Sequence, residues 1–277
     1  MMKSIREIFI RQKRDRMLKR NQNFIIAIVG PTGSGKTYAA ITLADELMYG
    51  KLNAAVHIVF TIEEFLNLIN SGVLKRGDIV VFEEAGVSIN SKNWASKANK
   101  NINFVLQTCR HMNFGIIFTL PLLKFLENAS RSLLHTSMVT NEGEIDYENK
   151  IAWLKVYDFK AHPLKSIEPY LIIPKFWIDG ILTKMRKIAV RMPRQELLDI
   201  YEPRKAAYTK KLYEDTLKRM NAESEDQEKK YNKAKPCDIC GSTEYRERVR
   251  TGDWKCRNGH VTQVDPWLKT DDNNGQY

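Results

Sequence analysis

Residues 30–37, with the sequence GPTGSGKT, constrain the fold of this chain more than any other segment. The segment fits the pattern G-x-x-x-x-G-K-[ST], follows the apolar run FIIAIV and opens a helical pattern. Glycines permit a loop whose successive backbone N–H groups face an anion, and the helix that follows adds its positive N-terminal end. The sequence therefore predicts a buried strand, a phosphate-binding loop and a helix, and we call residues 30–37 the phosphate loop.

The residue types in the phosphate loop predict a bound nucleoside triphosphate with Mg²⁺. Lys36 is placed to reach the β- and γ-phosphates, and the Thr37 hydroxyl is placed to ligate Mg²⁺. The candidate ATP-binding residues are those of the loop and the residue after it: Gly30, Pro31, Thr32, Gly33, Ser34, Gly35, Lys36, Thr37 and Tyr38.

Two carboxylates, Glu83 and Glu84, directly follow the apolar run IVVF, which is typical of a buried strand. Ligands of α/β sheets bind outside the carboxyl ends of the strands, so both carboxylates are expected at the nucleotide site. Glu83 is placed to hold a metal-bound water, and Glu84 is placed to orient or deprotonate the attacking water. Most phosphate-loop proteins carry Asp at the first position, so which carboxylate lies nearer Mg²⁺ stays open.

Strands alternate with helices between residues 23 and 140, which indicates an α/β fold with a mainly parallel sheet. Within this part, residues 54–60 are expected to form the second strand, and residues 122–134 one helix. The later segments IAWLKVYDF and EPYLIIPKFW predict an antiparallel addition. The expected divisions are a basic N-terminal helical segment (1–22), a nucleotide-binding core (23–140), a strand-rich extension (141–193), a charged helical linker (194–235), a Cys-containing domain (236–265) and a disordered tail (266–277).

The chain of 277 residues carries 44 Lys and Arg against 33 Asp and Glu, a formal net charge of +11 that favours acidic partners such as DNA. The basic residues of segment 1–22 fit either a helix packed on the core or a nucleic-acid contact. Together with that segment, two other groups are the expected DNA contacts: Lys184, Arg186, Lys187, Arg191 and Arg194, and Arg246, Arg248, Arg250, Lys255 and Arg257. The second group also fits a solvated face of the Cys-containing domain.

The chain is expected to be cytoplasmic. Its longest apolar run, residues 114–123, is far shorter than the roughly 18 residues that a membrane span requires, so no membrane insertion is expected. The N-terminus lacks the apolar region of a signal peptide. Four cysteines in such a chain favour metal binding or free thiols over disulfides.

A further pattern lies in residues 107–131. Arg110 and His111 precede the strand FGIIFTL, in which Thr119 is the last polar residue, and Arg131 follows. Together with the phosphate loop and the two carboxylates, this order resembles the HerA/FtsK superfamily of additional-strand P-loop ATPases, and within it the zonula-occludens-toxin-like (Zot) and viral DNA-packaging ATPases. The resemblance covers about residues 22–140.

This resemblance implies a RecA-like core and a ring-forming motor, expected as a hexamer, that translocates DNA or, in filamentous-phage relatives, assists virion extrusion. The sequence departs from the family in two ways. The family often has Gln at the position of Thr119, and phage relatives usually carry a membrane helix that this chain lacks. The second departure favours DNA work in the cytoplasm over extrusion.

Phosphoryl transfer spreads negative charge over the γ-phosphate oxygens, and a cation from a neighbouring subunit can offset it. Arg110 and Arg131 are the candidates for that cation, and each also fits an ordinary structural or surface arginine. Thr119 fits either a contact to the attacking water or a strand end.

Cys237, Cys240, Cys256 and His260 form two close pairs separated by 15 residues, which is the spacing of a zinc ribbon. His260 stands in place of the usual fourth Cys, one residue late. A segment of this size cannot bury a sufficient core, so bound Zn²⁺ is expected to supply its folding energy. A reversible disulfide or unpaired thiols are the alternatives.

The sequence thus predicts an Mg²⁺- and ATP-dependent P-loop ATPase that moves or packages DNA as a ring oligomer for a virus or mobile element. Two alternatives remain open. One is a virion-assembly or secretion ATPase of the Zot type that acts on protein. The other is a nucleotide-dependent DNA-binding switch with slow hydrolysis.

Overall fold

The computed structural model describes residues 4–83, 105–107, 112–126, 128–160, 170–231, 236–247, 253–263 and 266. The chain forms two compact units, Met1–Lys205 and Ala206–Tyr277. Among the helices described, none is both long enough and apolar enough to cross a membrane.

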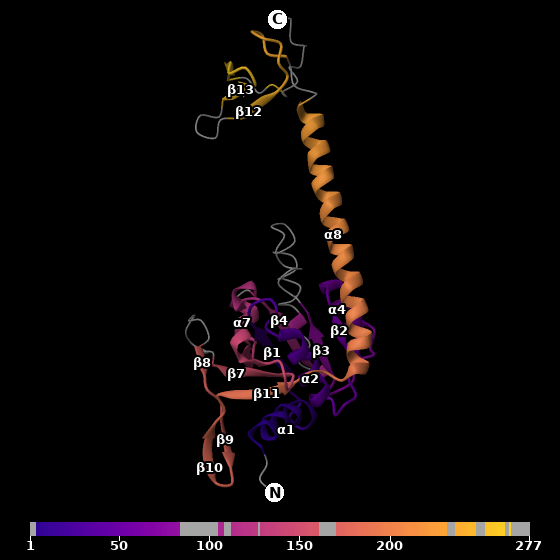
Figure 1. The fold of residues 1–277 in the computed structure, drawn as a ribbon, viewed down its shortest axis with the longest axis vertical. Helices are drawn as coiled ribbons and strands as arrows, with labels where there is room; N and C mark the ends of the chain where they lie inside the picture. Colours follow the sequence, from indigo (N-terminus) through magenta and orange to yellow (C-terminus); the bar gives the residue numbers. More distant parts are fainter. Residues whose placement is uncertain are drawn as a thin grey trace, which may run out of the picture. The chain divides into compact units, whose positions relative to one another are not determined.

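The first unit is built on one mixed sheet (Figure 1). Five parallel strands lie in the order β5-β1-β4-β3-β2: Thr136–Val139, Phe24–Val29, Gly115–Leu120, Ile79–Phe82 and Ile58–Val59. Beyond β5 the sheet continues with β7 (Ile151–Lys160), which is antiparallel to β5. Three further strands pair antiparallel with β7: β11 (Lys187–Arg191) and the short β6 (Ile145–Asp146) and β8 (Tyr170–Ile172). The α/β class, the mainly parallel sheet and the antiparallel addition are therefore confirmed.

Strand β4 lies between β1, which leads into the phosphate loop, and β3, which leads into Glu83. The register pairs Ile28 with Thr119 and Phe82 with Phe118. Every residue of β3 and β4 is buried, as expected of central strands covered on both faces. Strand β4 thus separates the strand before the phosphate loop from the strand before Glu83.

The two faces of the sheet bury different helices. On one face, Phe82 packs against Phe118 and against Phe65 of α4 (Ile62–Asn70), with ring centroids 5.7 and 5.5 Å apart. Because side chains alternate along a strand, Glu83 and Thr119 belong to the opposite face. Helix α2 (Lys36–Leu47) contacts β3 and β4, and it brings Thr37 to Glu83.

The prediction of a second strand over residues 54–60 was right for Ile58 and Val59 and wrong for residues 54–57. Residues Ala54–His57 form the short helix α3, and only Ile58 and Val59 pair in the sheet. The reason is local: the Asn53 side chain accepts a hydrogen bond from the Ala55 N–H and caps a helical turn.

The prediction of one helix over residues 122–134 was also wrong. The segment contains a 3₁₀ turn, Leu123–Phe125, and a separate short helix α7, Asn128–Ser132. Between them Leu126 adopts an extended conformation and is fully buried in the core. Burial of this side chain interrupts the helix.

Helix α1 (Ile5–Leu18) packs on the core. A capping box of Ser4 and Glu7 starts it, and Phe9 and Met17 are fully buried. Several of its basic side chains are bound within the first unit: Lys13 to Asp158, Arg14 to the Leu47 carbonyl and Arg16 to the Asn23 carbonyl. The structure therefore shows the first of the two alternatives for this segment, a helix packed on the core.

Three elements complete the chain. Strands β9 (Lys175–Ile178) and β10 (Ile181–Lys184) form a hairpin in the first unit. Helix α8 (Gln195–Tyr231) begins in the first unit and continues into the second. The second unit ends in a three-stranded sheet of β12 (Tyr245–Glu247), β13 (Trp254–Cys256) and β14 (Val261–Thr262).

Candidate nucleotide and metal sites

The phosphate loop joins the carboxyl end of β1 to the start of α2. Gly33 and Gly35 have φ angles of 82° and 75°, and Gly35 is the N-cap of α2. Glycine adopts this left-handed region without the steric cost that a Cβ imposes. The backbone conformation of the loop therefore favours glycine at positions 33 and 35.

The phosphate loop packs closely against Thr140, the residue after β5. A Cβ at Gly30 would lie 2.2 Å from Thr140 Oγ1 and 2.6 Å from its carbonyl oxygen, so only glycine fits there. Ser34 Oγ lies 2.7 Å from Thr140 Oγ1 and donates to the Pro31 carbonyl at 2.7 Å. Thr140 was not predicted as part of the site, although it is a polar residue directly after a buried strand.

The side chains predicted to bind phosphate and metal lie around this loop. Lys36 Nζ donates to the Pro31 carbonyl at 2.6 Å, which holds the ammonium over the loop. Thr37 Oγ1 donates to Glu83 Oε1 at 3.0 Å. The sequence placed Thr37 and Glu83 in one site, and the structure brings them into contact.

The residues present fit Mg²⁺. Hydroxyl and carboxylate oxygens are the ligands that Mg²⁺ prefers, and it retains several waters when bound to proteins. Glu83 is only 2% exposed, and its Oε2 is buried and receives no hydrogen bond from any described residue. A buried carboxylate oxygen of this kind suits a metal-bound water.

Two side chains of α8 also reach Glu83, and neither was predicted from the sequence. Tyr201 donates its hydroxyl to Glu83 Oε1 at 2.7 Å, and Lys205 Nζ lies 3.1 Å from the same oxygen. Burial, and then the Glu83 charge, raise the pKa of Tyr201 well above its usual range. This hydroxyl therefore stays protonated and acts as a donor.

A second contact joins α8 to the start of α2. The Tyr38 hydroxyl donates to Glu202 Oε1 at 2.6 Å, and this hydrogen bond raises the pKa of Tyr38 to about 12. Arg204 donates to the Ala54 carbonyl, so the first turns of α8 contact α3 as well as α2.

The structure describes two of the other four predicted catalytic residues, Thr119 and Arg131. Glu84 and Arg110 lie outside the described residues. Thr119 is buried on β4 at the level of Ile28. Arg131 lies on α7, where its guanidinium donates to Asn128. The roles of these four residues stay predictions.

The four predicted zinc ligands converge in the second unit. The ligand atoms of Cys237, Cys240, Cys256 and His260 all lie within 4.8 Å of one another. Cys240 Sγ is 3.7 Å from Cys256 Sγ, and Cys256 Sγ is 3.5 Å from His260 Nδ1. A tetrahedral site with Zn–S of about 2.3 Å and Zn–N of about 2.0 Å has ligand-to-ligand edges of roughly 3.5–3.8 Å. The cluster therefore fits Zn²⁺.

Backbone N–H groups support the thiolates. Those of Ile239 and Cys240 lower the pKa of Cys237, and that of Ser242 lowers the pKa of Cys240. Burial raises the pKa of Cys256. The apolar core around the cluster is small, with Tyr245 and Cys256 as its buried members among the described residues, so a bound metal would add to its stability.

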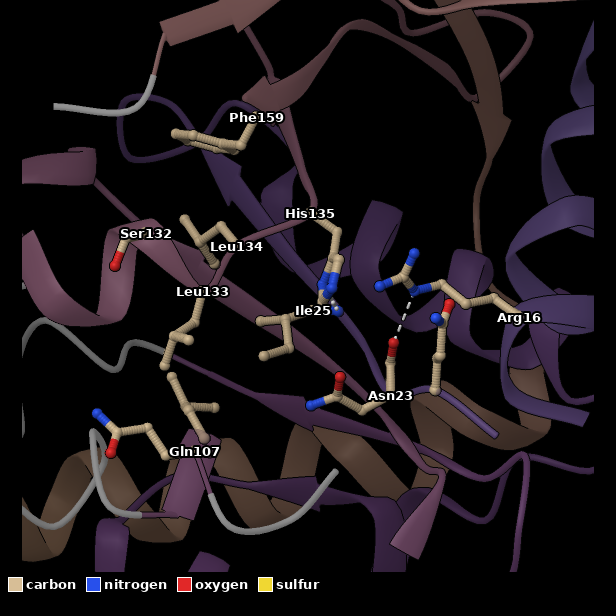
Figure 2. Close-up of a pocket in the computed structure, with 11 residues that line it drawn as sticks. Arg16, Asn23, Ile25, Gln107, Ser132, Leu133, Leu134, His135 and Phe159 are labelled. Atoms are coloured by element: carbon tan, nitrogen blue, oxygen red, sulfur yellow. Dashed lines mark hydrogen bonds between the residues drawn. The ribbon is translucent and has the colours of Figure 1, made fainter. Parts of the chain in front are cut away.

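A cavity of about 520 Å³ lies at the opposite edge of the sheet, near the amino ends of β1 and β5. Figure 2 shows His135 and Ile25 in its wall, and Arg16 donating to the Asn23 carbonyl. His135 Nδ1 accepts the Ile25 N–H at 3.1 Å. Because the phosphate loop follows the carboxyl end of β1, this cavity is separate from the candidate nucleotide site.

Several residues of the expected DNA contacts are bound within the first unit. Lys187 donates to Glu144 at 3.0 Å, and Arg194 forms a bidentate pair with Asp45 at 2.9 and 3.0 Å. Arg248 and Arg250 lie outside the described residues.

No protein-family model matches the sequence, and a search among curated proteins found no match. Among solved structures, the N-terminal domain of zonular occludens toxin from Neisseria meningitidis is similar over 57% of this chain and 95% of that chain, with 20% identity and a TM-score of 0.32. EssC (ATPases 2 and 3) from Geobacillus thermodenitrificans is similar over 70% of this chain and 45% of that chain, with 13% identity and a TM-score of 0.35. Both TM-scores are too low to decide a fold, so the α/β class stands on the strand order described above.

Proposed function

We propose that this chain is an ATPase that hydrolyses Mg²⁺-ATP at the phosphate loop. One observation carries the proposal: the loop lies at the carboxyl end of β1 and places the Thr37 hydroxyl 3.0 Å from the buried carboxylate of Glu83. An anion cradle beside a hydroxyl and a carboxylate is the combination that binding of a metal-nucleotide requires.

In the proposed mechanism, the N–H groups of the loop and the Lys36 ammonium bind the phosphates and offset their charge. Thr37 would ligate Mg²⁺ and Glu83 would hold a water bound to that ion, which when present would neutralise charge on the phosphate oxygens. Glu84 orients or deprotonates the attacking water as general base. An arginine, Arg110 or Arg131 of a neighbouring copy, supplies a further cation as the transferred charge develops.

We further propose that hydrolysis drives movement or packaging of DNA by a ring of subunits. The net charge of +11 and the resemblance of residues 22–140 to DNA motors support this proposal. The side chains of Arg14, Arg16, Lys187 and Arg194 bind groups of the first unit, and Arg257 binds Glu244. We therefore propose that other basic residues contact DNA, with Arg248 and Arg250, which lie near the Cys/His cluster in the sequence, as candidates. We propose that this cluster holds Zn²⁺.

The experiment that tests the DNA function is the rate of ATP hydrolysis measured without nucleic acid, with duplex DNA and with single-stranded DNA. A motor should be strongly stimulated by at least one of the two DNA forms. An ATPase that acts on protein in virion assembly or secretion should show no stimulation. A nucleotide-dependent DNA-binding switch should hydrolyse slowly and respond only slightly.

A further inference from the structure

Helix α8 lies outside residues 22–140, over which the chain resembles motor ATPases, yet it contributes directly to the candidate nucleotide site. The Tyr201 hydroxyl donates to Glu83 Oε1 at 2.7 Å, and Lys205 Nζ lies 3.1 Å from that oxygen. The two residues are four positions apart, so they project from one face of the helix. Tyr201 also stacks on Phe60, with ring centroids 6.3 Å apart, which fixes its ring.

The two carboxylate oxygens of Glu83 differ in their hydrogen bonds. Oε1 accepts hydrogen bonds from both Thr37 and Tyr201. Oε2 is buried and has no hydrogen-bond donor among the described residues. Contacts confined to one oxygen restrict rotation of the carboxylate group, so the remaining oxygen keeps one direction.

We propose that Tyr201 is a positioning residue for Mg²⁺ binding, because its hydroxyl orients Glu83 so that Oε2 is presented to the waters of the metal. This inference rests on the proposed ATPase function and extends the nucleotide site to α8. Groups that orient a metal-binding side chain typically account for 10–100-fold in metal affinity or activity. Tyr201 offers a cleaner test than Lys205, because replacing it by Phe changes no charge.

The test is Tyr201→Phe, which removes one hydroxyl and retains the ring that stacks on Phe60. Binding of a fluorescent ATP analogue is titrated with Mg²⁺ and, separately, measured in EDTA. We expect the Mg²⁺ concentration for half-maximal enhancement of binding to rise about ten-fold or more in the variant. Binding in EDTA should equal that of the wild type, because the phosphate loop is unchanged. Tyr213→Phe is the matched control: it makes the same substitution on the same helix at a residue that is 65% exposed, and it should behave as wild type.

Three results would overturn the inference. A Tyr201→Phe protein with the Mg²⁺ dependence of the wild type would show that the hydroxyl has no positioning role. Equal losses of binding in Mg²⁺ and in EDTA would show general damage to the site. If the wild type binds the analogue without any dependence on Mg²⁺, then the proposed ATPase function fails first and this inference fails with it.

Discussion

His135 is a partly buried histidine that the fold holds in its neutral form. Its Nδ1 accepts the Ile25 N–H at 3.1 Å, so the proton of the neutral ring lies on Nε2. Burial, and then the charges of Arg16 and Lys13, lower the pKa of His135 from 6.5 to about 3. The unfolded chain therefore binds a proton below about pH 6.5, whereas the folded chain does not until about pH 3.

This difference predicts that His135 weakens the fold as the pH falls from about 6.5 toward 3, at up to roughly 1.4 kcal/mol per pH unit. Urea unfolding of the wild type and of His135→Asn, which keeps a hydrogen-bond acceptor but does not titrate, checks the prediction. The free energy of unfolding should fall less steeply for the variant between pH 7 and pH 5. Identical slopes for the two proteins would show that His135 does not titrate as described.

Among the structural elements, the Cys/His cluster is the one for which we predict the strongest dependence of stability on a bound metal. We expect the purified, reduced protein to contain one zinc per chain, and Cys237→Ser to release it because the tetrahedral site loses a thiolate. ATP binding should persist, because the phosphate loop belongs to the other compact unit. Cys109→Ser, at the one cysteine outside the cluster, is the control and should retain zinc. Absence of zinc from a preparation never exposed to chelator would refute the assignment.

The elements predicted correctly are those whose local sequence is compatible with only one type of secondary structure. The run FIIAIV before a glycine loop forms β1, and FGIIFTL supplies β4, because continuous apolar runs of this length suit central strands. The short run at residues 54–60 had two solutions, and the Asn53 cap selected a helical turn. Burial of Leu126 likewise divided a segment whose pattern suggested one helix.

The candidate nucleotide site also contains one contact that could be predicted from the sequence and one that could not. Contact between Thr37 and Glu83 could be predicted because the carboxyl ends of parallel strands meet at one edge of a sheet. Tyr201 lies 118 residues from Glu83, within a helix that resembles a solvated linker in sequence. No periodicity or spacing rule links two such positions, so that contact required the folded structure.

For the molecule as a whole, the basic charge predicts sequence-independent binding of DNA. Neutralised phosphates release counterions, so the logarithm of affinity should fall linearly with the logarithm of salt concentration, at about −0.9 per contact on duplex DNA. Changing both Arg248 and Arg250 to Glu should weaken binding equally for all sequences and make this slope shallower by about one unit per lost contact. A filter-binding or anisotropy titration over several salt concentrations measures both quantities. Scrambled DNA serves as the control. An affinity that does not change with salt concentration would contradict the prediction that these basic residues contact DNA phosphates.

The central claim is that the phosphate loop hydrolyses Mg²⁺-ATP, and release of phosphate by three purified proteins tests it most directly. The wild type should release phosphate only with Mg²⁺, and Lys36→Ala should not, because the phosphates lose their cation. Glu84→Gln should bind ATP as the wild type does and turn over at least ~100-fold more slowly, the scale of a lost general base. Near-normal turnover by Glu84→Gln would refute its assignment as the base. Equal phosphate release by the wild type and Lys36→Ala, or none from the wild type, would contradict the account.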